Sequence, residues 1–342
     1  MPVRQTWGVG STCASPKQPL LEVCDLTVTY APEHGSQVRA VEAASFEVGT
    51  SEVVAILGES GSGKSTLASA IVRLLPSFAN YDRGAIRFQG QDLLQMTESE
   101  LREIRGARIS HIPQDPAQTL NPVMRVGTQI SEVLRAHRDL SRASRNARVQ
   151  ELLAEVGFEN PEEIASAYPH QLSGGQRQRI AIAQAISCGP GLVVADEPTS
   201  KLDASLRSGI IELLARLRQK HGTAFILISH DPGIVSGFAD RVLVMYAGRV
   251  IEQGPVAEVW RQPLHPYTQG LLKLAQAQLV SSNRARTLFP SIAGEPADLS
   301  CMTVACRFEP RCSERMKICT KEFPPELTPH PSHRVSCFKY GE

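Results

Sequence analysis

The sequence predicts an α/β fold built around a parallel sheet. Four short apolar runs, rich in Val and Ile, occupy Val53–Leu57, Leu192–Ala195, Phe225–Ile228 and Val242–Met245. Uninterrupted apolar runs of this length are typical of strands that helices cover on both faces. Helical patterns such as Ser205–Lys220 lie between them, and this alternation of strands and helices indicates an α/β domain.

Composition narrows the class of protein. The chain has 342 residues, of which 42% are hydrophobic, enough for one large domain or two ordinary domains with a sizeable core. The formal net charge of +1 argues against nucleic acid as the main partner. No apolar run reaches the roughly 18 residues that a membrane span needs, and the N-terminal segment MPVRQTWGVGSTCASPKQPL lacks the apolar core of a signal peptide. We therefore expect a soluble, cytoplasmic chain with reduced thiols.

The domain organisation follows from changes in pattern along the chain. We expect a flexible leader at residues 1–19, a main domain at 20–278 and a small Cys-rich C-terminal appendage at 279–342. A mainly helical subdomain is expected within the main domain, at about residues 116–170. The main domain opens with antiparallel β-structure, predicted at Leu21–Tyr30, Ala40–Val48 and Ala85–Gly90.

A phosphate-binding loop follows the first predicted strand of the parallel sheet. The segment GESGSGKST fits the pattern G-x-x-x-x-G-K-[ST] between a strand and a helix, a context that disfavours a chance glycine-rich turn. Its backbone N–H groups can surround phosphate oxygens at the positive end of the following helix. We expect Lys64 to reach the β- and γ-phosphates and Ser65 to bind Mg²⁺. The predicted nucleotide-binding residues are Gly58, Glu59, Ser60, Gly61, Ser62, Gly63, Lys64, Ser65 and Thr66. This motif indicates a P-loop NTPase without distinguishing kinases, GTPases and ATPases.

Two acidic residues follow the apolar run at Leu192–Ala195. Asp196, at the end of a buried strand, can hold Mg²⁺ through water. Glu197 can serve as the general base that polarises the attacking water. The alternative is a pair of acids capping a strand end, which the presence of a phosphate-binding loop disfavours.

The segment LSGGQ, which begins at Leu172, predicts a second anion site at the start of a helix. A chain with one phosphate-binding loop holds one ATP, so a second site is surplus within a monomer. The second anion site has a function if it binds the ATP held by a partner subunit. From the local residues alone, an ordinary helix N-cap is the simpler interpretation.

Together these motifs resemble those of the ATPase subunits of ABC transporters. LSGGQ resembles their signature, HIPQDP at His111–Pro116 their Q-loop, SKLDAS at Ser200–Ser205 their D-loop and ISHD at Ile228–Asp231 their H-switch. The resemblance covers roughly residues 20 to 340. It implies the ABC ATPase fold, with a RecA-like core, an antiparallel β subdomain and a helical subdomain.

The resemblance also implies roles for individual residues. Gln114 would contact Mg²⁺ and the attacking water, and His230 would lie near the γ-phosphate. Asp203 is the aspartate of the D-loop, and Tyr30 resembles the aromatic residue that stacks on adenine, although a core aromatic is a serious alternative. The family commonly has Ala where this chain has Lys201, close to the dimer seam. The signature residues that would contact the partner's ATP are Ser173, Gly174, Gly175 and Gln176.

Two longer segments resemble the importers of oligopeptides, dipeptides and nickel: Gln114–Leu134 and Ala247–Leu272. This implies an ATP-hydrolysing subunit that energises the import of peptides or a related small solute, bound peripherally at the cytoplasmic face of the inner membrane. Its partners would be a second, related or identical ATPase subunit, two membrane permeases and, indirectly, a substrate-binding protein. Nickel import is the alternative within the family. A soluble ABC ATPase acting on ribosomes or DNA is disfavoured by the single phosphate-binding loop and the lack of a long heptad run. A regulatory subunit without hydrolysis is disfavoured by Glu197 and His230.

Cysteines are concentrated at the C-terminus, where five of the eight lie in the last 42 residues. Cys306, Cys312, Cys319 and Cys337 follow C-x₅-C-x₆-C-x₁₇-C, and gathered thiolates suit a [4Fe–4S] cluster or a structural Zn²⁺. The gaps are wider than in most zinc sites. The segment also resembles the C-terminal extension of dipeptide-importer ATPases, which favours iron–sulfur over zinc and places an empty thiol cluster third. Cys301 could replace one ligand. We expect a structural role without a part in hydrolysis, because the cluster is far in sequence from every ATP motif.

Overall fold

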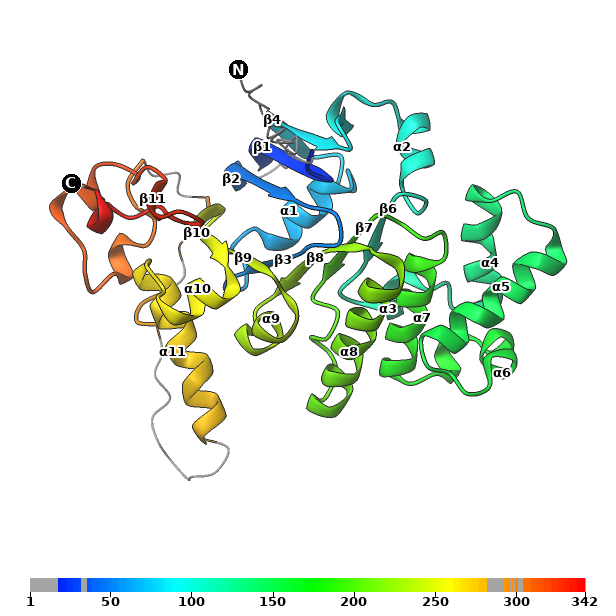
Figure 1. Ribbon diagram of the computed structural model, residues 1–342. Coiled ribbons are helices and arrows are strands. Elements are labelled where there is room, and N and C mark those ends of the chain that lie inside the picture. Colours follow the sequence, from blue (N-terminus) through cyan, green and yellow to red (C-terminus); the bar gives the residue numbers. More distant parts are fainter. Residues whose placement is uncertain are drawn as a thin grey trace, which may run out of the picture.

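The computed structural model describes residues 18–31, 36–281, 292–295, 297, 299–300 and 304–341. Most of the predicted leader and Cys301 lie outside these residues. Among the described helices, none is long and apolar enough to span a bilayer. The elements form two sheets, with the helical subdomain at one end and the C-terminal region at the other (Figure 1).

The main sheet has eight strands in the order β11-β12-β10-β9-β3-β8-β7-β6. The predicted parallel strands are present, and a further strand, β6, extends them. This parallel part consists of β9 (Arg241–Tyr246), β3 (Val53–Leu57), β8 (Ala224–Ser229), β7 (Leu192–Asp196) and β6 (Ile109–Ile112). The remaining strands pair antiparallel and are β10 (Arg249–Pro255), β12 (His333–Val335) and β11 (Leu327–His330).

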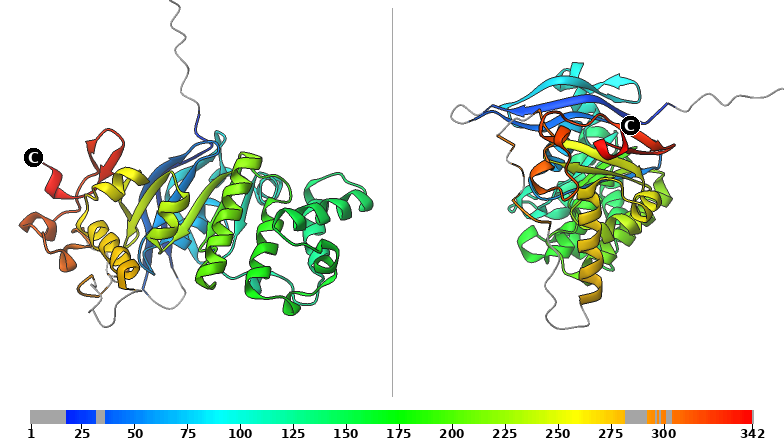
Figure 2. Two further views of the ribbon diagram at one scale, coloured as in Figure 1. Left: turned by 60° about the horizontal axis from the view of Figure 1, so that its bottom comes forward. Right: turned by 90° about the vertical axis from the view of Figure 1, so that its left-hand side faces the viewer.

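The second sheet is antiparallel, as predicted, and lies across the first (Figure 2). It is formed by β2 (Val38–Val48), β1 (Leu21–Tyr30), β4 (Ala79–Phe88) and β5 (Gln91–Asp92). Helix α1 (Lys64–Ile71) lies between the two sheets, because its apolar residues share one buried cluster with both. Helix α2 (Glu98–Ile104) begins at a capping box formed by Thr97 and Glu100 and packs on the same cluster.

The other face of the parallel strands is covered by helices. Alternate side chains of β7 and β8, such as Val193 and Phe225, pack against α7 (Gly174–Ile186) and α8 (Ala204–His221). The same face carries α9 (Pro232–Phe238). The helical subdomain between β6 and α7 agrees with the prediction and contains α3 (Pro116–Thr119), α4 (Val126–His137), α5 (Arg142–Glu155) and α6 (Pro161–Ser166).

The C-terminal region differs from the predicted separate appendage. Its strands β11 and β12 extend the main sheet beside β10. Phe308 packs in one buried cluster with Tyr246 of β9 and Tyr267 of α11 (Pro266–Ser281), beside α10 (Val256–Arg261). The region therefore takes its core from the main domain, because Phe308 and its apolar neighbours find their partners on β9 and α11.

Candidate active site

The phosphate-binding loop runs from the end of β3 to the start of α1, as predicted. Gly63 caps α1 with a φ of 98°, and a Cβ there would lie 2.2 Å from the carbonyl oxygen of Ala40. A Cβ on Gly58 would lie 2.3 Å from the carbonyl oxygen of Met245. Both glycines are required because the backbones of β2 and β9 approach the loop too closely for a Cβ at either position.

Lys64 is held by the loop itself. Its Nζ donates hydrogen bonds to the carbonyl oxygens of Gly58 at 2.9 Å and Glu59 at 2.7 Å. Burial lowers the pKa of the Lys64 ammonium, and the nearby carboxylates of Glu197, Asp196 and Glu59 oppose that shift. The ammonium therefore lies near three carboxylates, and its positive charge is available to pair with a bound phosphate group.

Ser65 and Asp196 meet at the mouth of the loop. Ser65 Oγ donates to Asp196 Oδ1 at 3.1 Å, and burial raises the pKa of the Asp196 carboxyl. Two adjacent oxygen groups of this kind fit Mg²⁺, which prefers hard oxygen ligands and lowers the charge on ATP phosphates. These two residues would hold the ion. Gln114, also predicted to bind Mg²⁺, donates its amide hydrogen bond to Glu197 instead.

Three predicted catalytic side chains converge at the carboxyl ends of adjacent strands. Gln114 follows β6, Glu197 follows β7 and His230 follows β8. Gln114 Nε2 donates to Glu197 Oε2 at 3.1 Å, and His230 Nδ1 lies 3.3 Å from Glu197 Oε1. The hydrogen bond with His230 lowers the pKa of Glu197, and the same contact raises the pKa of His230.

Glu197 also has an unusual backbone. Its φ is 44°, in the left-handed region that side chains other than Gly rarely adopt, and such strain is concentrated at functional sites. The turn directs the carboxylate back toward Gln114 and His230. An ionised carboxylate held by two side chains can accept a proton from water.

Tyr30 lies beside the loop at the end of β1. Its Oη is 3.2 Å from Thr66 Oγ1, and its ring centroid is 5.7 Å from that of Phe78, whose side chain is 50% exposed. The two rings therefore form a partly exposed aromatic surface next to the phosphate site, so adenine stacking by Tyr30 stays a prediction.

The signature and D-loop residues start two helices. Ser173 caps α7 in a reciprocal capping box with Gln176, so the simpler interpretation of LSGGQ as a helix N-cap holds locally. Ser173 and Gly174 are exposed. Asp203 caps α8 by accepting from Leu206 N–H at 3.0 Å. Lys201, the departure from the family pattern, forms an ion pair with Asp115, the residue after Gln114.

The cysteine residues lie together but do not form the predicted metal site. Within the described part of the chain, no group of three or more His, Cys, Asp or Glu side chains is arranged to hold a metal ion. Cys306 N–H donates to the carbonyl of Cys319 at 2.9 Å. Burial raises the pKa of the Cys306 thiol to about 11, and the thiols of Cys319, Cys337 and Cys312 add to the rise. Burial also raises the pKa values of the Cys312 and Cys337 thiols.

Two side chains from outside the predicted set form hydrogen bonds with Glu59 of the phosphate-binding loop. Tyr267 Oη accepts a hydrogen bond from Glu59 N–H at 2.8 Å, and Arg311 Nη1 donates to the Glu59 carboxylate at 2.8 Å. Tyr267 belongs to the HPYT segment of the chain, and Arg311 directly precedes Cys312. Nothing local to either residue indicated a contact with Glu59. Although the C-terminal region is far from the ATP motifs in sequence, it therefore contacts the phosphate-binding loop in the fold.

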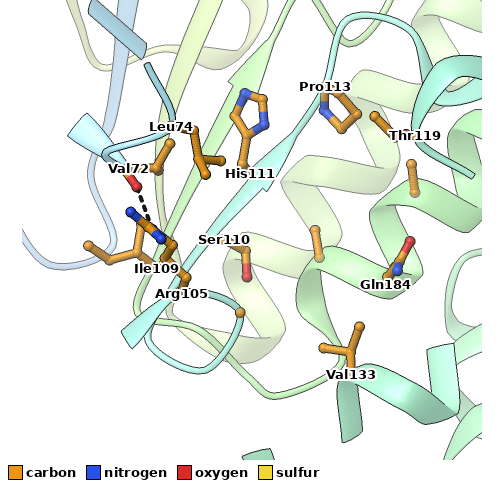
Figure 3. Close-up of a pocket in the computed structure, with 13 residues that line it drawn as sticks. Val72, Leu74, Arg105, Ile109, Ser110, His111, Pro113, Thr119, Val133 and Gln184 are labelled. Carbon is orange, nitrogen blue, oxygen red and sulfur yellow. Dashed lines mark hydrogen bonds between the residues drawn. The ribbon is translucent and has the colours of Figure 1, made fainter. Parts of the chain in front are cut away.

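A groove lies where the core meets the helical subdomain. A cavity of about 300 Å³ lies between β6, α4 and α7, and its lining includes Leu74, His111, Pro113, Val133 and Gln184 (Figure 3). Ser110 Oγ and His111 Nε2 are buried without a hydrogen-bond partner in the described residues. The groove is therefore mainly apolar, and two of its lining residues each carry a buried polar atom without a partner among the described residues.

Comparisons with known proteins agree with these features. Two family models match the chain, "ABC transporter" at residues 41–200 and "Oligopeptide/dipeptide transporter, C-terminal region" at residues 251–319. The oligopeptide transport ATP-binding protein OppD of Bacillus subtilis is 42% identical over 92% of this chain and 87% of its own length. The dipeptide transport ATP-binding protein DppD of the same organism is 42% identical over 93% of this chain and 94% of its own length.

A solved structure is similar in fold. It is a dimeric ATP-binding cassette in a post-hydrolysis state with ADP and Pi, with a TM-score of 0.62 and 28% identity over 69% of this chain and 98% of that chain. The cassette fold, the assembled ATP motifs and the identity to these relatives over nearly the whole chain show that the protein belongs to the ABC transporter family, among the ATP-binding proteins of oligopeptide and dipeptide transport.

Proposed function

We propose that this chain hydrolyses ATP to drive the import of peptides, as a peripheral subunit at the cytoplasmic face of the inner membrane. The observation that carries the proposal is the convergence of Gln114 and His230 on Glu197 beside the phosphate-binding loop. The peptide class rests on the names of the relatives, which are oligopeptide and dipeptide transport proteins. Nickel is the alternative solute.

Different residues of the chain bind the phosphates, accept the proton and position the base. Lys64 and the loop N–H groups bind the phosphates, and Mg²⁺ at Ser65 and Asp196 would neutralise part of their charge. Glu197 accepts a proton from the attacking water. His230 and Gln114 hold the Glu197 carboxylate in place. A base oriented from two sides suits hydrolysis better than a regulatory subunit that only binds ATP.

We propose that the ATP site is completed by a second ATPase subunit. Support comes from the exposed Ser173 and Gly174 at the start of α7 and from the similar cassette, which was solved as a dimer. The helix start offers backbone N–H groups to an anion. A Cβ added to Gly174 would meet nothing within 4 Å, so this end is open toward a partner's γ-phosphate.

We propose that a cytoplasmic segment of a membrane permease docks in the groove between β6, α4 and α7. Its mainly apolar lining suits a segment with apolar side chains. Pro113 of the groove precedes Gln114 directly. Movement of a docked segment would thus shift Gln114 and alter its hydrogen bond with Glu197.

Cross-linking tests the permease assignment. Cysteines at Asn121 and at Val123, whose side chain is 79% exposed, should cross-link to a membrane subunit in the intact complex. Gln219→Cys, at an exposed position on α8, is the matched control and should not. Cross-links only to ribosomal or other soluble proteins would favour the soluble ABC ATPase.

Stimulation of hydrolysis tests the solute. The complex with its membrane subunits should hydrolyse ATP faster when its binding protein carries a peptide. Stimulation by Ni²⁺ alone would assign the chain to nickel import.

We propose a [4Fe–4S] cluster on Cys306, Cys312, Cys319 and Cys337, with Zn²⁺ as the alternative. The thiol chemistry and the spacing of the four residues in the sequence support a metal. Their arrangement in the described residues does not fit one. Anaerobic purification should yield brown protein with about four irons per chain. Colourless protein with one zinc would favour the alternative, and metal-free protein with freely alkylated thiols would refute both.

A further inference from the structure

Glu59, the second residue of the phosphate-binding loop, is fixed at each of its polar groups. Its N–H donates to Tyr267 Oη at 2.8 Å. Its carbonyl oxygen accepts from Lys64 Nζ at 2.7 Å. Its carboxylate accepts from both terminal nitrogens of Arg311, at 2.8 and 3.1 Å. Two of these three partners come from outside the P-loop core, from α11 and from the C-terminal region.

The Arg311 side chain is buried and held by several contacts. Its side chain is 5% exposed, and it also donates to the carbonyl oxygens of Ala293 at 2.9 Å and Ile292 at 3.2 Å. Its guanidinium lies near the rings of Tyr246 and Phe308. A buried guanidinium that forms a bidentate hydrogen bond with a carboxylate fixes both distance and orientation.

Tyr267 is anchored just as firmly. Its side chain is fully buried and its ring lies 4.8 Å from that of Tyr246. The chain entering α11 is held by Glu252, which accepts from Leu264 N–H at 2.7 Å and His265 N–H at 2.9 Å. Glu252 also contacts His333 of β12 at 2.7 Å. The start of α11 is therefore tied to the C-terminal strands.

The charge of Glu59 explains why its carboxylate must be held in place. A carboxylate in a phosphate-binding loop repels ATP, and it also attracts the Lys64 ammonium that the phosphates need. Arg311 neutralises the carboxylate and fixes its orientation through two hydrogen bonds. Without Arg311, the Glu59 side chain would be free to pair with Lys64 or to face the phosphates as an uncompensated charge.

We infer that Arg311 is a positioning residue for ATP binding, which makes the C-terminal region a functional part of the nucleotide site. Because coupling between two sites is reciprocal, bound nucleotide must also stabilise the docking of residues 304–341. The inference rests on ATP binding by this chain and is independent of the transported solute.

Nucleotide titration of the full chain with a non-hydrolysable Mg–ATP analogue tests this inference. Arg311→Ala should weaken binding by roughly 10- to 100-fold, the loss expected for a charged hydrogen-bonded pair. In the complex, the change should appear in KM more than in kcat, because Glu197 is untouched. Arg311→Lys, which keeps the charge and loses the fork, should fall between. The control is Arg315→Ala in the same region, whose exposed side chain pairs with Glu309 at 3.4 Å, and it should bind normally.

A double variant separates positioning from a merely structural role. Glu59→Gln should restore much of the affinity lost in Arg311→Ala, since it removes the unpaired carboxylate. Normal binding by Arg311→Ala, or loss that Glu59→Gln does not relieve, would overturn the inference. If Arg311→Ala does not fold, hydrogen exchange of the wild-type chain decides: the analogue should slow exchange within residues 304–341, and unchanged exchange there would refute the linkage.

Discussion

His230 Nδ1 lies 3.3 Å from Glu197 Oε1, across the carboxyl ends of two adjacent parallel strands. The contact orients the proposed base and lowers the pKa of its carboxyl. It also makes the protonation of each side chain depend on the other. Two predictions test these consequences.

Glu197→Gln should preserve ATP binding and lower turnover by about 10²–10⁴-fold, the range for loss of a positioned general base. The amide keeps the shape of the side chain but cannot accept the proton. The measurement is phosphate release by the purified complex, with nucleotide binding measured in parallel. Turnover near the wild-type rate would show that another group is the base.

The pKa of His230 should lie above its ordinary value of 6.5 and fall when Glu197 is replaced by Gln, because the carboxylate contact is what raises it. Its contribution to stability is complete below pH 6.5 and is lost as pH rises through the raised value. The contribution of Glu197, whose pKa is lowered from 4.5, is lost as pH falls through that lowered value. NMR titration of the imidazole measures the shift. An equal His230 pKa in both proteins would contradict the pairing.

Two glycines of the phosphate-binding loop should differ in their tolerance of Ala. Gly61 has a φ of 78° and open space around its Cβ position, so Gly61→Ala should cost only about 1–2 kcal/mol of left-handed strain. Gly63→Ala adds a clash at 2.2 Å with the Ala40 carbonyl. It should therefore lower the free energy of unfolding further and abolish nucleotide binding. Denaturant unfolding and nucleotide titration compare the pair, and equal losses would refute the steric argument.

A carboxylate at the signature should block ATP-induced dimerisation. Gly175→Asp would place its Cβ 3.1 Å from Leu206 Cδ1, whereas Gly174 has open space. Gly174→Asp is therefore the cleaner change, and Gly174→Asn is its neutral control of the same size. In a Glu197→Gln background, the Asp variant should stay monomeric in light scattering and the Asn variant should dimerise more. Equal dimerisation by both would remove the signature from the partner's phosphate site.

The sequence alone was enough to predict the parts of the site that depend on local geometry. A strand, a glycine-rich turn and a helix are consecutive, so Gly58–Thr66 could be assigned from its pattern. The sequence also predicted the apolar strands, because burial on both faces of a sheet leaves continuous Val- and Ile-rich runs. The acids after β7 and the signature at the start of α7 were identified from their short local motifs.

Which distant residues meet depends on the packing of the whole fold. The strand order brings Gln114, Glu197 and His230 together, and residues 327–335 join the main sheet although their short polar pattern suggested a separate unit. Glu59 meets Tyr267 and Arg311, 208 and 252 residues away. Many arginines in the chain could satisfy a carboxylate equally well. The choice of Arg311 arises from packing, since Phe308, Tyr246 and Tyr267 share one buried cluster that places its guanidinium at the phosphate-binding loop.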